Sequence, residues 1–336
     1  MLTDRFNRPL RDIRLSVTDK CNFRCPYCMP VEVYGEDYQF SPKSEILTFE
    51  EIKRLIALFQ RAGTEKVRIT GGEPLIRKNI SGLVASLADI PGLNDLTLTT
   101  NGWFLAQHAA ELKKAGLNRV TVSLDSLDSK IFAQMNGRGF GPEKVLEGIE
   151  AALAAGLTPL KVNAVVKRSE NYDSLLDLVA HFRGTGVIVR FIEYMDVGNR
   201  NGWVMDEVVP SAELVERIDR RWPLEPMEAN YRGEVASRYR FLDGQGEIGV
   251  ISSITQPFCG DCVRARLTTD GRFITCLFAE TGLNLRDPMR AGAGDDELSG
   301  LIESCWSNRE DRYSELRASV PGGDSRRKIE MYQVGG

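Results

Sequence analysis

Seven cysteines stand out in this chain of 336 residues, because six of them form two closely spaced triplets. The triplets are Cys21, Cys25 and Cys28 near one end, and Cys259, Cys262 and Cys276 near the other. Thiolates are soft ligands that suit iron–sulfur clusters, zinc or copper(I). An odd number of cysteines, in a chain whose first residues lack the apolar core of a signal peptide, favours reduced thiols over a disulfide framework. The triplets are therefore candidate metal sites.

The first triplet has the spacing C-x3-C-x2-C, which can wrap three corners of a cubane cluster and leave its fourth iron without a cysteine ligand. A structural zinc ion needs four ligands. The two histidines, His108 and His181, fall in predicted helical segments far from this loop. A zinc loop that borrows a remote ligand is the alternative, and a cluster with an open iron fits the spacing better.

The second triplet has the spacing C-x2-C-x13-C and again offers three thiolates without an obvious fourth ligand. The seventh cysteine, Cys305, could complete a four-cysteine zinc site. It shares helical spacing with Leu298, Leu301 and Ile302, however, and such a stripe is typical of a buried helix face. We therefore expect Cys305 in the hydrophobic core and a second open iron at the triplet.

Two arginines accompany the second triplet. Arg264 and Arg266 are two residues apart, so on a strand they project from one face, and guanidinium groups bind phosphate through paired hydrogen bonds. The whole chain has 43 Lys and Arg against 47 Asp and Glu, a net charge of −4, which excludes a global basic field. Any anionic ligand must therefore be held by local arginines, and we expect a phosphate or polar substrate beside the second triplet.

The hydrophobic pattern predicts six strands that alternate with helices. The strands are expected at residues 12–18, 66–70, 95–100, 119–124, 160–166 and 187–194. The helices are expected after a capping box of Thr48 and Glu51, and at residues 80–87, 106–115, 145–155 and 174–183. Units of about 30 residues imply right-handed crossovers and a parallel sheet. Six units fall short of the eight of a full barrel, so we predict an α/β fold with a partial (β/α)6 TIM-type barrel, open on one side.

In such a barrel the active site lies at the C-terminal ends of the strands. The loops that meet there are the first cysteine loop, residues 71–74, residues 99–102, and the segment with Ser123 and Asp125. After residue 194 the pattern changes to helices near 211–221 and 296–306 and short β-like segments within 238–254. We assign residues 1–208 to the partial barrel. Residues 209–336 are assigned to a smaller C-terminal α+β domain that carries the second triplet and a Gly-Gly tail and covers the opening.

The loop CNFRCPYC at residues 21–28 resembles the cluster loop of the radical S-adenosylmethionine superfamily, with Tyr27 before the last cysteine. In that superfamily the open iron chelates S-adenosylmethionine, and one electron cleaves the sulfonium to give methionine and a 5′-deoxyadenosyl radical. GGEP at residues 71–74 matches the methionine-binding segment, where glycines allow close backbone approach and Glu73 could meet an ammonium group. Radical chemistry agrees with a chain that has only two histidines for acid–base catalysis.

Further segments resemble a branch of this superfamily that cyclises GTP in molybdenum cofactor biosynthesis. They are LTTNG at residues 98–102, SLDS at 123–126, RFIEYMDVGN at 190–199, CVRARL at 262–267 and the terminal Gly335-Gly336. The resemblance covers nearly the whole chain and implies a lyase that abstracts the 3′ hydrogen of GTP and joins C3′ to C8. The implied product is (8S)-3′,8-cyclo-7,8-dihydroguanosine 5′-triphosphate. A homodimer, an electron donor of flavodoxin type and a following cyclic pyranopterin monophosphate synthase are implied as well.

The same resemblance assigns roles residue by residue. Each triplet holds one [4Fe-4S] cluster, and the open iron of the second binds the guanine end of GTP. The residues that contact S-adenosylmethionine are Tyr27, Gly72, Ser123 and Met195. The residues that match GTP-contacting positions are Arg14, Arg68, Thr99, Lys161, Arg264 and Arg266, with Arg190 as a further cationic candidate. The cofactor carries the radical, so no side chain is assigned as catalytic, and the tail of Gly335 and Gly336 is expected to thread into the cavity.

Two other functions compete with this interpretation. A radical S-adenosylmethionine maturase that modifies peptides could also carry an auxiliary cluster, but such relatives usually have more C-terminal cysteines than the three found here. A zinc-binding module for nucleic acid is disfavoured by the acidic charge balance and by the missing fourth ligands. No apolar run reaches the ~18 residues of a membrane-spanning helix, so we expect no membrane partner. The charge balance argues against a nucleic-acid partner, and the missing signal-peptide core favours a cytoplasmic location.

Overall fold

The six predicted strands are present in the computed structural model, which describes residues 1–317 and 327–335. They are β1 (Asp12–Ser16), β2 (Lys66–Thr70), β3 (Asp95–Thr100), β4 (Arg119–Ser123), β5 (Lys161–Val166) and β6 (Ile188–Glu193). Each strand pairs in parallel with the next one along the chain. The structure therefore confirms the parallel sheet. The ends of β2 and β3 are as predicted, and those of the other four strands differ from the predicted ends by at most two residues.

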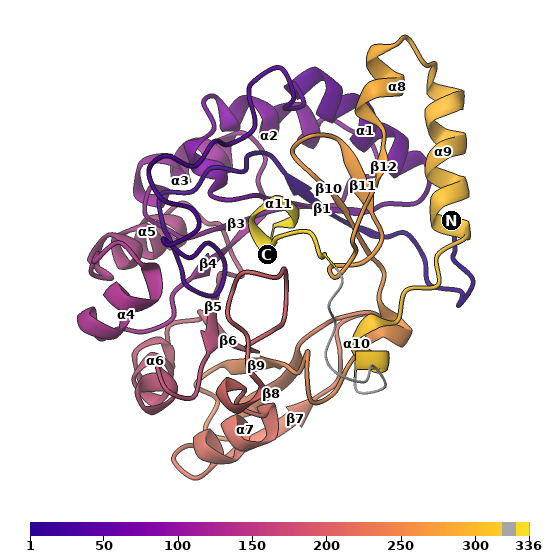
Figure 1. Ribbon diagram of the computed structural model, residues 1–336. Coiled ribbons are helices and arrows are strands. Elements are labelled where there is room, and N and C mark those ends of the chain that lie inside the picture. The colour runs from indigo at the N-terminus through magenta and orange to yellow at the C-terminus, as the bar shows by residue number, and fades with distance from the viewer. Residues whose placement is uncertain (318–326, 336) are drawn as a thin grey trace.

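Six helices lie between these strands along the chain: α1 (Phe49–Arg61), α2 (Ile80–Ala88), α3 (Leu105–Lys114), α4 (Ser129–Asn136), α5 (Glu143–Ala154) and α6 (Leu175–Phe182). The predicted capping box starts α1, since Thr48 and Glu51 exchange side-chain to backbone hydrogen bonds. The hydrophobic pattern does not predict α4, whose N-cap Asp128 accepts hydrogen bonds from the amides of Lys130 and Ile131. Figure 1 shows the helices on the outside of the curled sheet.

The C-terminal segment extends this sheet at both edges. β10 (Arg264–Leu267) pairs in parallel with β1, and β9 (Glu247–Ile251) pairs in parallel with β6. The remaining strands continue antiparallel beyond these two: β7 (Leu224–Met227), β8 (Ser237–Phe241), β11 (Arg272–Ile274) and β12 (Leu283–Asn284). The described sheet thus has 12 strands, with β12 and β7 at its ends. The predicted C-terminal segment builds on both sides of the open barrel, while a domain boundary at residue 208 stays a prediction.

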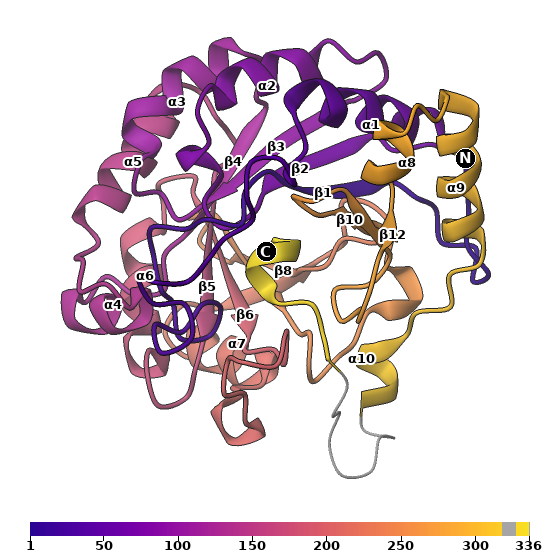
Figure 2. The same ribbon diagram turned by 45° about the horizontal axis from the view of Figure 1, so that its top comes forward.

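The C-terminal helices are α7 (Ser211–Asp219), α8 (Arg286–Arg290), α9 (Asp295–Ser307), α10 (Tyr313–Leu316) and α11 (Met331–Val334). α9 buries Leu298, Ile302 and Trp306, whereas Leu301 and Cys305 are partly buried against the same core. The predicted stripe is therefore confirmed for Leu298 and Ile302 and only partly for the other two residues. The sequence pattern does not predict α11, which lies inside the ring of strands and loops in Figures 1 and 2. Within the described residues, no helix is long and apolar enough to cross a membrane.

Alternate residues of the barrel strands face opposite sides of the sheet. In β1, Ile13 and Leu15 belong to the hydrophobic core, whereas Arg14 between them lines an internal cavity. In β2, Val67 and Ile69 belong to the core, whereas the buried Arg68 bonds to polar side chains on the inner face. The barrel therefore has an apolar outer layer under its helices and a cationic interior.

One buried carboxylate fixes the end of β6. Glu193 is fully buried and accepts hydrogen bonds from the amides of Ser211, Ile254 and Thr255. These contacts tie β6 to the start of α7 and to the segment that follows β9. The loop with Met195 leaves β6 directly after this anchor, so it is held at the mouth of the barrel.

Candidate functional site

One cavity at the C-terminal ends of the barrel strands receives both cysteine triplets. Its lining includes all six triplet cysteines, which come from the loop after β1 and from the segment 259–276. The residues predicted to contact S-adenosylmethionine also line it: Tyr27, Gly72, Ser123 and Met195. Cys305 lies on α9 outside this lining. The fold therefore brings two motifs from opposite ends of the chain to a single site.

The GGEP turn after β2 supports the first cysteine loop. The amide of Gly72 donates to the carbonyl of Thr18 at 2.7 Å, and the amide of Glu73 donates to the carbonyl of Lys20 at 2.8 Å. A Cβ atom on Gly72 would come within 3.0 Å of the Lys20 backbone. Glycine is therefore required here by the cysteine loop itself, in addition to any ligand that approaches from the cavity.

Glu73 has a different role from the one expected from the sequence. Its side chain is fully buried and outside the cavity lining, so it is not placed to meet an ammonium group of a ligand. The carboxylate accepts hydrogen bonds from the Thr100 hydroxyl at 2.7 Å, the Asn101 amide at 2.7 Å and the Leu75 amide at 3.0 Å. Burial raises the pKa of Glu73 to about 7, and these donors limit the rise. Glu73 locks the loop after β3 to the GGEP turn.

Replacing Glu73 with alanine is expected to lower the free energy of unfolding by about 3 kcal/mol, because buried amide donors lose their acceptor. Asn101, which reaches the first cysteine loop through a 2.8 Å hydrogen bond to Asn22, would lose its anchor. Urea unfolding of the apoprotein measures the effect, with Glu150→Ala on the exposed face of α5 as the control. Equal unfolding free energies for the two variants would contradict the assignment.

A hydrogen bond orients Tyr27 in the cavity wall beside the first cysteine triplet. The Tyr27 hydroxyl donates to Oδ2 of Asp125 at 2.7 Å, and Oδ1 of Asp125 accepts from the Val165 amide at 2.9 Å. Burial raises the pKa of Asp125 to about 6, and these two donors limit the rise. The sequence places Asp125 at the barrel mouth without a role. In the structure it positions the aromatic residue of the cysteine loop.

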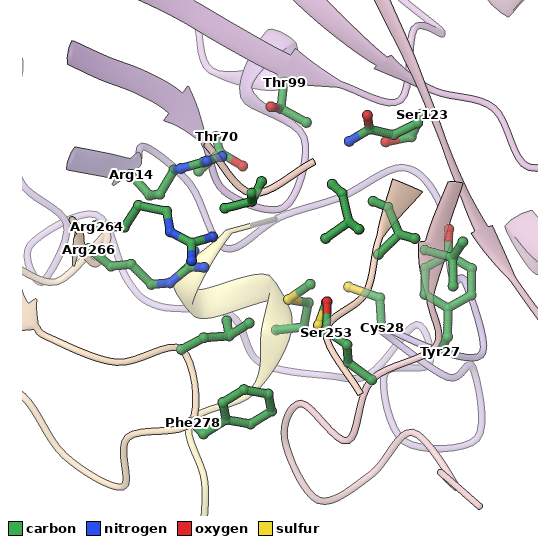
Figure 3. A pocket seen from close by; sticks show the side chains of 18 of the residues that line it. Arg14, Tyr27, Cys28, Thr70, Thr99, Ser123, Ser253, Arg264, Arg266 and Phe278 are labelled. Carbon is green, nitrogen blue, oxygen red and sulfur yellow. The ribbon is translucent and has the colours of Figure 1, made fainter. Parts of the chain in front are cut away.

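Four of the predicted cationic residues line the cavity: Arg14, Arg190, Arg264 and Arg266. Figure 3 shows Arg14, Arg264 and Arg266 gathered on the side opposite Cys28 and Tyr27. Arg264 and Arg266 thus project from one face of β10, as their spacing predicts.

Two other predicted contacts, Arg68 and Lys161, are not among the lining residues. Arg68 reaches the site indirectly, because its Nη1 donates to the hydroxyls of Thr99 at 3.1 Å and Thr121 at 2.9 Å. Thr99 itself lines the cavity. Lys161 lies on β5 beside Thr121 of β4 in the sheet register. Both cations therefore form a second layer beneath the lining.

The cations of this region destabilise one another. Burial, together with repulsion from neighbouring arginines, lowers the pKa of Arg190 to about 10, that of Arg266 to about 9 and that of Lys161 to about 7. Burial would raise the pKa of Asp12, but the combined field of Arg14 and the other nearby cations lowers it. Buried cations that repel one another are stabilised by an anion. The interior of the barrel is therefore suited to a polyanionic ligand.

The triplet thiols have the surroundings of cluster ligands. The Phe23 amide donates to Sγ of Cys21 at 3.4 Å, and Arg264 donates to Sγ of Cys262 at 3.4 Å. N–H donors of this kind tune the sulfurs of iron–sulfur clusters. Burial raises the pKa of both Cys21 and Cys276 to about 12, so a bare thiolate is unfavourable there and a bound iron centre supplies the missing positive charge. The residues present fit two clusters.

A single metal ion fits less well. Among residues 1–317 and 327–335, no group of three or more His, Cys, Asp or Glu side chains is arranged to hold one ion. A structural zinc ion draws its sulfur ligands to about 2.3 Å, whereas a cluster distributes its thiolates over several irons. The zinc site completed by Cys305 also finds no support, because that side chain packs on the core.

The C-terminal tail enters the same region. Nη1 of Arg266 donates to the carbonyl of Gly335 at 2.5 Å and to that of Val334 at 3.1 Å. Gly335 has a φ of 69°, and a Cβ atom on it would come within 3.0 Å of the Thr70 side chain. The other predicted tail residue, Gly336, lies outside the described residues. The structure therefore places Gly335 between Arg266 and the Thr70 side chain at the end of β2.

Comparisons with known proteins match both halves of this site. A family described as Radical SAM superfamily matches residues 15–182, and one described as Molybdenum Cofactor Synthesis C matches residues 187–315. The GTP 3′,8-cyclase of Acidothermus cellulolyticus is 50% identical over 100% of this chain and 99% of its own length. The GTP 3′,8-cyclase of Staphylococcus carnosus is 44% identical over 100% of this chain and 99% of its own length.

Solved structures share the fold. The crystal structure of Streptococcus suis SuiB bound to S-adenosylmethionine is similar with a TM-score of 0.58 and 17% identity, over 95% of this chain and 77% of that chain. At this identity the similarity supports the partial barrel and its C-terminal extension alone.

Proposed function

The chain belongs to the GTP 3′,8-cyclase family of radical S-adenosylmethionine enzymes, and we propose that its cavity binds S-adenosylmethionine at the first cysteine triplet and GTP at the second. One observation carries this proposal: two triplets without a fourth ligand and a set of mutually repelling cations line or underlie one cavity. Two open irons would give the cofactor and the nucleotide one attachment point each. The cations would neutralise the triphosphate despite the net charge of −4.

When bound, the reduced first cluster and S-adenosylmethionine supply the radical that removes the 3′ hydrogen of GTP before C3′ joins C8. The residues of the chain bind, orient and shield these groups. Cys21, Cys25 and Cys28 would hold the first cluster. Tyr27, Gly72, Ser123 and Met195 would contact S-adenosylmethionine, and their place on the cavity wall supports these roles. The cavity walls would limit the access of water to a reactive species.

GTP would bind to the cavity wall that lies across from the first triplet. Cys259, Cys262 and Cys276 would hold a second cluster that binds the guanine end of GTP. The cations that would bind its phosphates directly are Arg14, Arg190, Arg264 and Arg266, and Thr99 would offer its hydroxyl. Arg68 and Lys161 would add positive charge from the second layer, with Arg68 fixing the Thr99 side chain.

Several partners follow from the family and stay proposals. The chain would act as a homodimer, accept electrons from a donor of flavodoxin type and pass its product to a cyclic pyranopterin monophosphate synthase. A reducing compartment such as the cytoplasm suits seven cysteines without a disulfide. Identity over the full length to GTP 3′,8-cyclases favours the nucleotide over the peptide substrate of the maturase alternative.

Lys161→Met is expected to stabilise the free protein and weaken the binding of GTP. Burial and repulsion from Arg190, Arg119 and Arg68 lower the pKa of Lys161 to about 7, below the value of about 10.4 in an unfolded chain. The stability contribution of Lys161 is thus full above pH 10 and is lost as the pH falls toward 7. The variant should raise Tm by about 2–4 °C at pH 6, with a smaller gain at pH 9. The Kd for GTP should rise about tenfold, which is 1.4 kcal/mol.

Differential scanning calorimetry and anaerobic equilibrium binding measure the two effects. Lys130→Met, at an exposed position on α4, is the matched control and should change neither quantity. A Tm gain that is the same at pH 6 and pH 9, or an unchanged Kd, would count against Lys161 as part of the anion site.

Equilibrium binding of labelled GTP to the reconstituted protein tests the proposed substrate directly. We expect one GTP per chain, with binding lost when Cys259 is replaced by alanine. A protein that retains both clusters and fails to bind GTP would overturn the proposal and return attention to a peptide substrate.

A further inference from the structure

A buried charged network joins the two ends of the chain beneath the second triplet. Asp4 and Arg8 come from the N-terminal segment, and Arg309 and Asp311 follow α9. Asp4, Arg8 and Arg309 are only 5%, 1% and 4% exposed. None of them stands out in the sequence, and the roles proposed for GTP and S-adenosylmethionine do not use them.

Each cysteine of the triplet has a link to this network. Nη1 of Arg8 donates to the carbonyl of Cys259 at 2.7 Å, and Nη1 of Arg309 donates to the carbonyl of Cys262 at 2.8 Å. The hydroxyl of Thr275, next to Cys276, donates to Oδ2 of Asp311 at 2.6 Å. The network therefore holds the backbone at Cys259 and Cys262 and the Thr275 side chain next to Cys276.

The two guanidinium groups share one acid. Oδ2 of Asp4 accepts from Nε of Arg8 at 2.6 Å and from Nη1 of Arg309 at 3.2 Å. Trp306 packs under Arg309, with 4.5 Å from the guanidinium carbon to the ring centre, and its Nε1 donates to the carbonyl of Arg8 at 3.1 Å. The guanidinium groups of Arg8 and Arg309 are therefore each held in one orientation.

The buried charges of this network are easier to explain if a cluster is bound to the second triplet than if the triplet binds no metal. Buried ion pairs contribute little net stability, because desolvation offsets the Coulomb attraction. Arg309 and its partner Asp311 both line the cavity, with 3.4 Å between Nε of Arg309 and Oδ2 of Asp311, whereas Asp4 lies beneath it. Three thiolates on the same wall would bring negative charge to face this arginine. Positive charge near the sulfurs stabilises the reduced form of a cluster.

We propose that Arg309, supported by Asp4 and Arg8, is a positioning residue for the second cluster. Arg309 fixes the loop through its hydrogen bond to the Cys262 carbonyl, beside the one from Arg8 to the Cys259 carbonyl, and it raises the reduction potential of the cluster by its charge. This inference rests on the second cluster of the proposed function.

The test compares Arg309→Met and Arg309→Lys with the wild-type protein after anaerobic reconstitution. Arg5→Gln is the matched control, because Arg5 pairs with Glu310 and joins the same two ends of the chain at the surface. Iron and sulfide analysis, together with electron paramagnetic resonance with and without S-adenosylmethionine, distinguishes the two clusters. Circular dichroism establishes that each variant is folded.

Arg309→Met is expected to lower the iron content from about eight to about four per chain, since each [4Fe-4S] cluster holds four irons. The electron paramagnetic resonance signal of the first cluster, which changes when S-adenosylmethionine is added, should remain. Arg309→Lys should keep most of the second cluster, because it keeps the charge, and any second cluster retained by the Met variant should have a more negative midpoint potential. Arg5→Gln should match the wild type.

A folded Arg309→Met protein with full iron and an unchanged second-cluster spectrum and potential would overturn the inference. Equal losses from both clusters in both variants would also overturn it, because a general loss of stability does not discriminate between the sites. A wild-type protein that takes up only about four irons would instead overturn the second cluster itself, and this inference with it.

Discussion

Replacing Cys276 with alanine is expected to leave the cleavage of S-adenosylmethionine intact while the conversion of GTP falls at least about a hundredfold, because the loss of a cluster ligand exceeds the effect of a second-shell change. The two triplets line one cavity but are supported separately. The first is held by the GGEP turn through Thr18 and Lys20, and the second by β10 and the segment after α9. The two loops are joined by the pairing of β10 with β1, a backbone contact that the loss of one thiol at position 276 leaves in place.

Cys28→Ala and Cys305→Ala complete this experiment. Cys28→Ala should abolish both cleavage and GTP conversion, since the first cluster is needed for each. Cys305 lies on α9 outside the cavity lining, so its loss should leave both reactions near the wild-type rate. Chromatography of 5′-deoxyadenosine and mass spectrometry of the nucleotide give the two rates. Loss of cleavage in Cys276→Ala would show that the triplets do not act separately.

Gly335→Ala is expected to slow the conversion of GTP by about 10- to 100-fold, which corresponds to about 1–3 kcal/mol of backbone strain. Gly335 has a φ of 69° and a ψ of 146°, a combination that residues with a Cβ atom rarely adopt. The added methyl group would also meet the side chain of Thr70. The tail would leave the cavity, and Arg266 would lose the two carbonyl groups to which it donates.

Gly292→Ala is the control for backbone strain without a steric clash. Gly292 has a φ of 99° but no neighbouring atom within 4 Å of the place that a Cβ atom would take. It should lower stability slightly and leave GTP conversion unchanged. The double variant Gly335→Ala with Thr70→Ala should recover part of the rate, since the nearest clash is removed. Single-turnover assays with equal iron content measure all three. A Gly335→Ala protein with the wild-type rate would contradict a role for the docked tail.

The sequence predicts those parts of the fold that depend on local patterns. The alternation in β1 and the capping box at Thr48 are local, and both are found in the structure. The cysteine spacings are also local, so they predict two three-thiolate loops that the fold then brings to one cavity. The helix α4 is missed because it has only eight residues and buries only two apolar side chains, Phe132 and Met135, behind its N-cap Asp128.

The parts that the sequence does not predict depend on contacts between distant residues. The GGEP motif suggests a ligand contact for Glu73, but only the position of Thr100 and Asn101 shows that it is a buried anchor. Arg309 meets Asp4 at the other end of the chain, and no spacing in the sequence connects them. The pairing of β9 and β10 with the edges of the barrel sheet is likewise a property of the folded chain.

The most direct test of the central claim is an anaerobic single-turnover reaction of the reconstituted protein with dithionite, S-adenosylmethionine and GTP deuterated at C3′. Mass spectrometry then follows the label. The account predicts deuterium in 5′-deoxyadenosine and a cyclised nucleotide that has lost it. Cleavage of S-adenosylmethionine with no deuterium in 5′-deoxyadenosine would contradict the account, because the hydrogen would then come from a position other than C3′ of GTP.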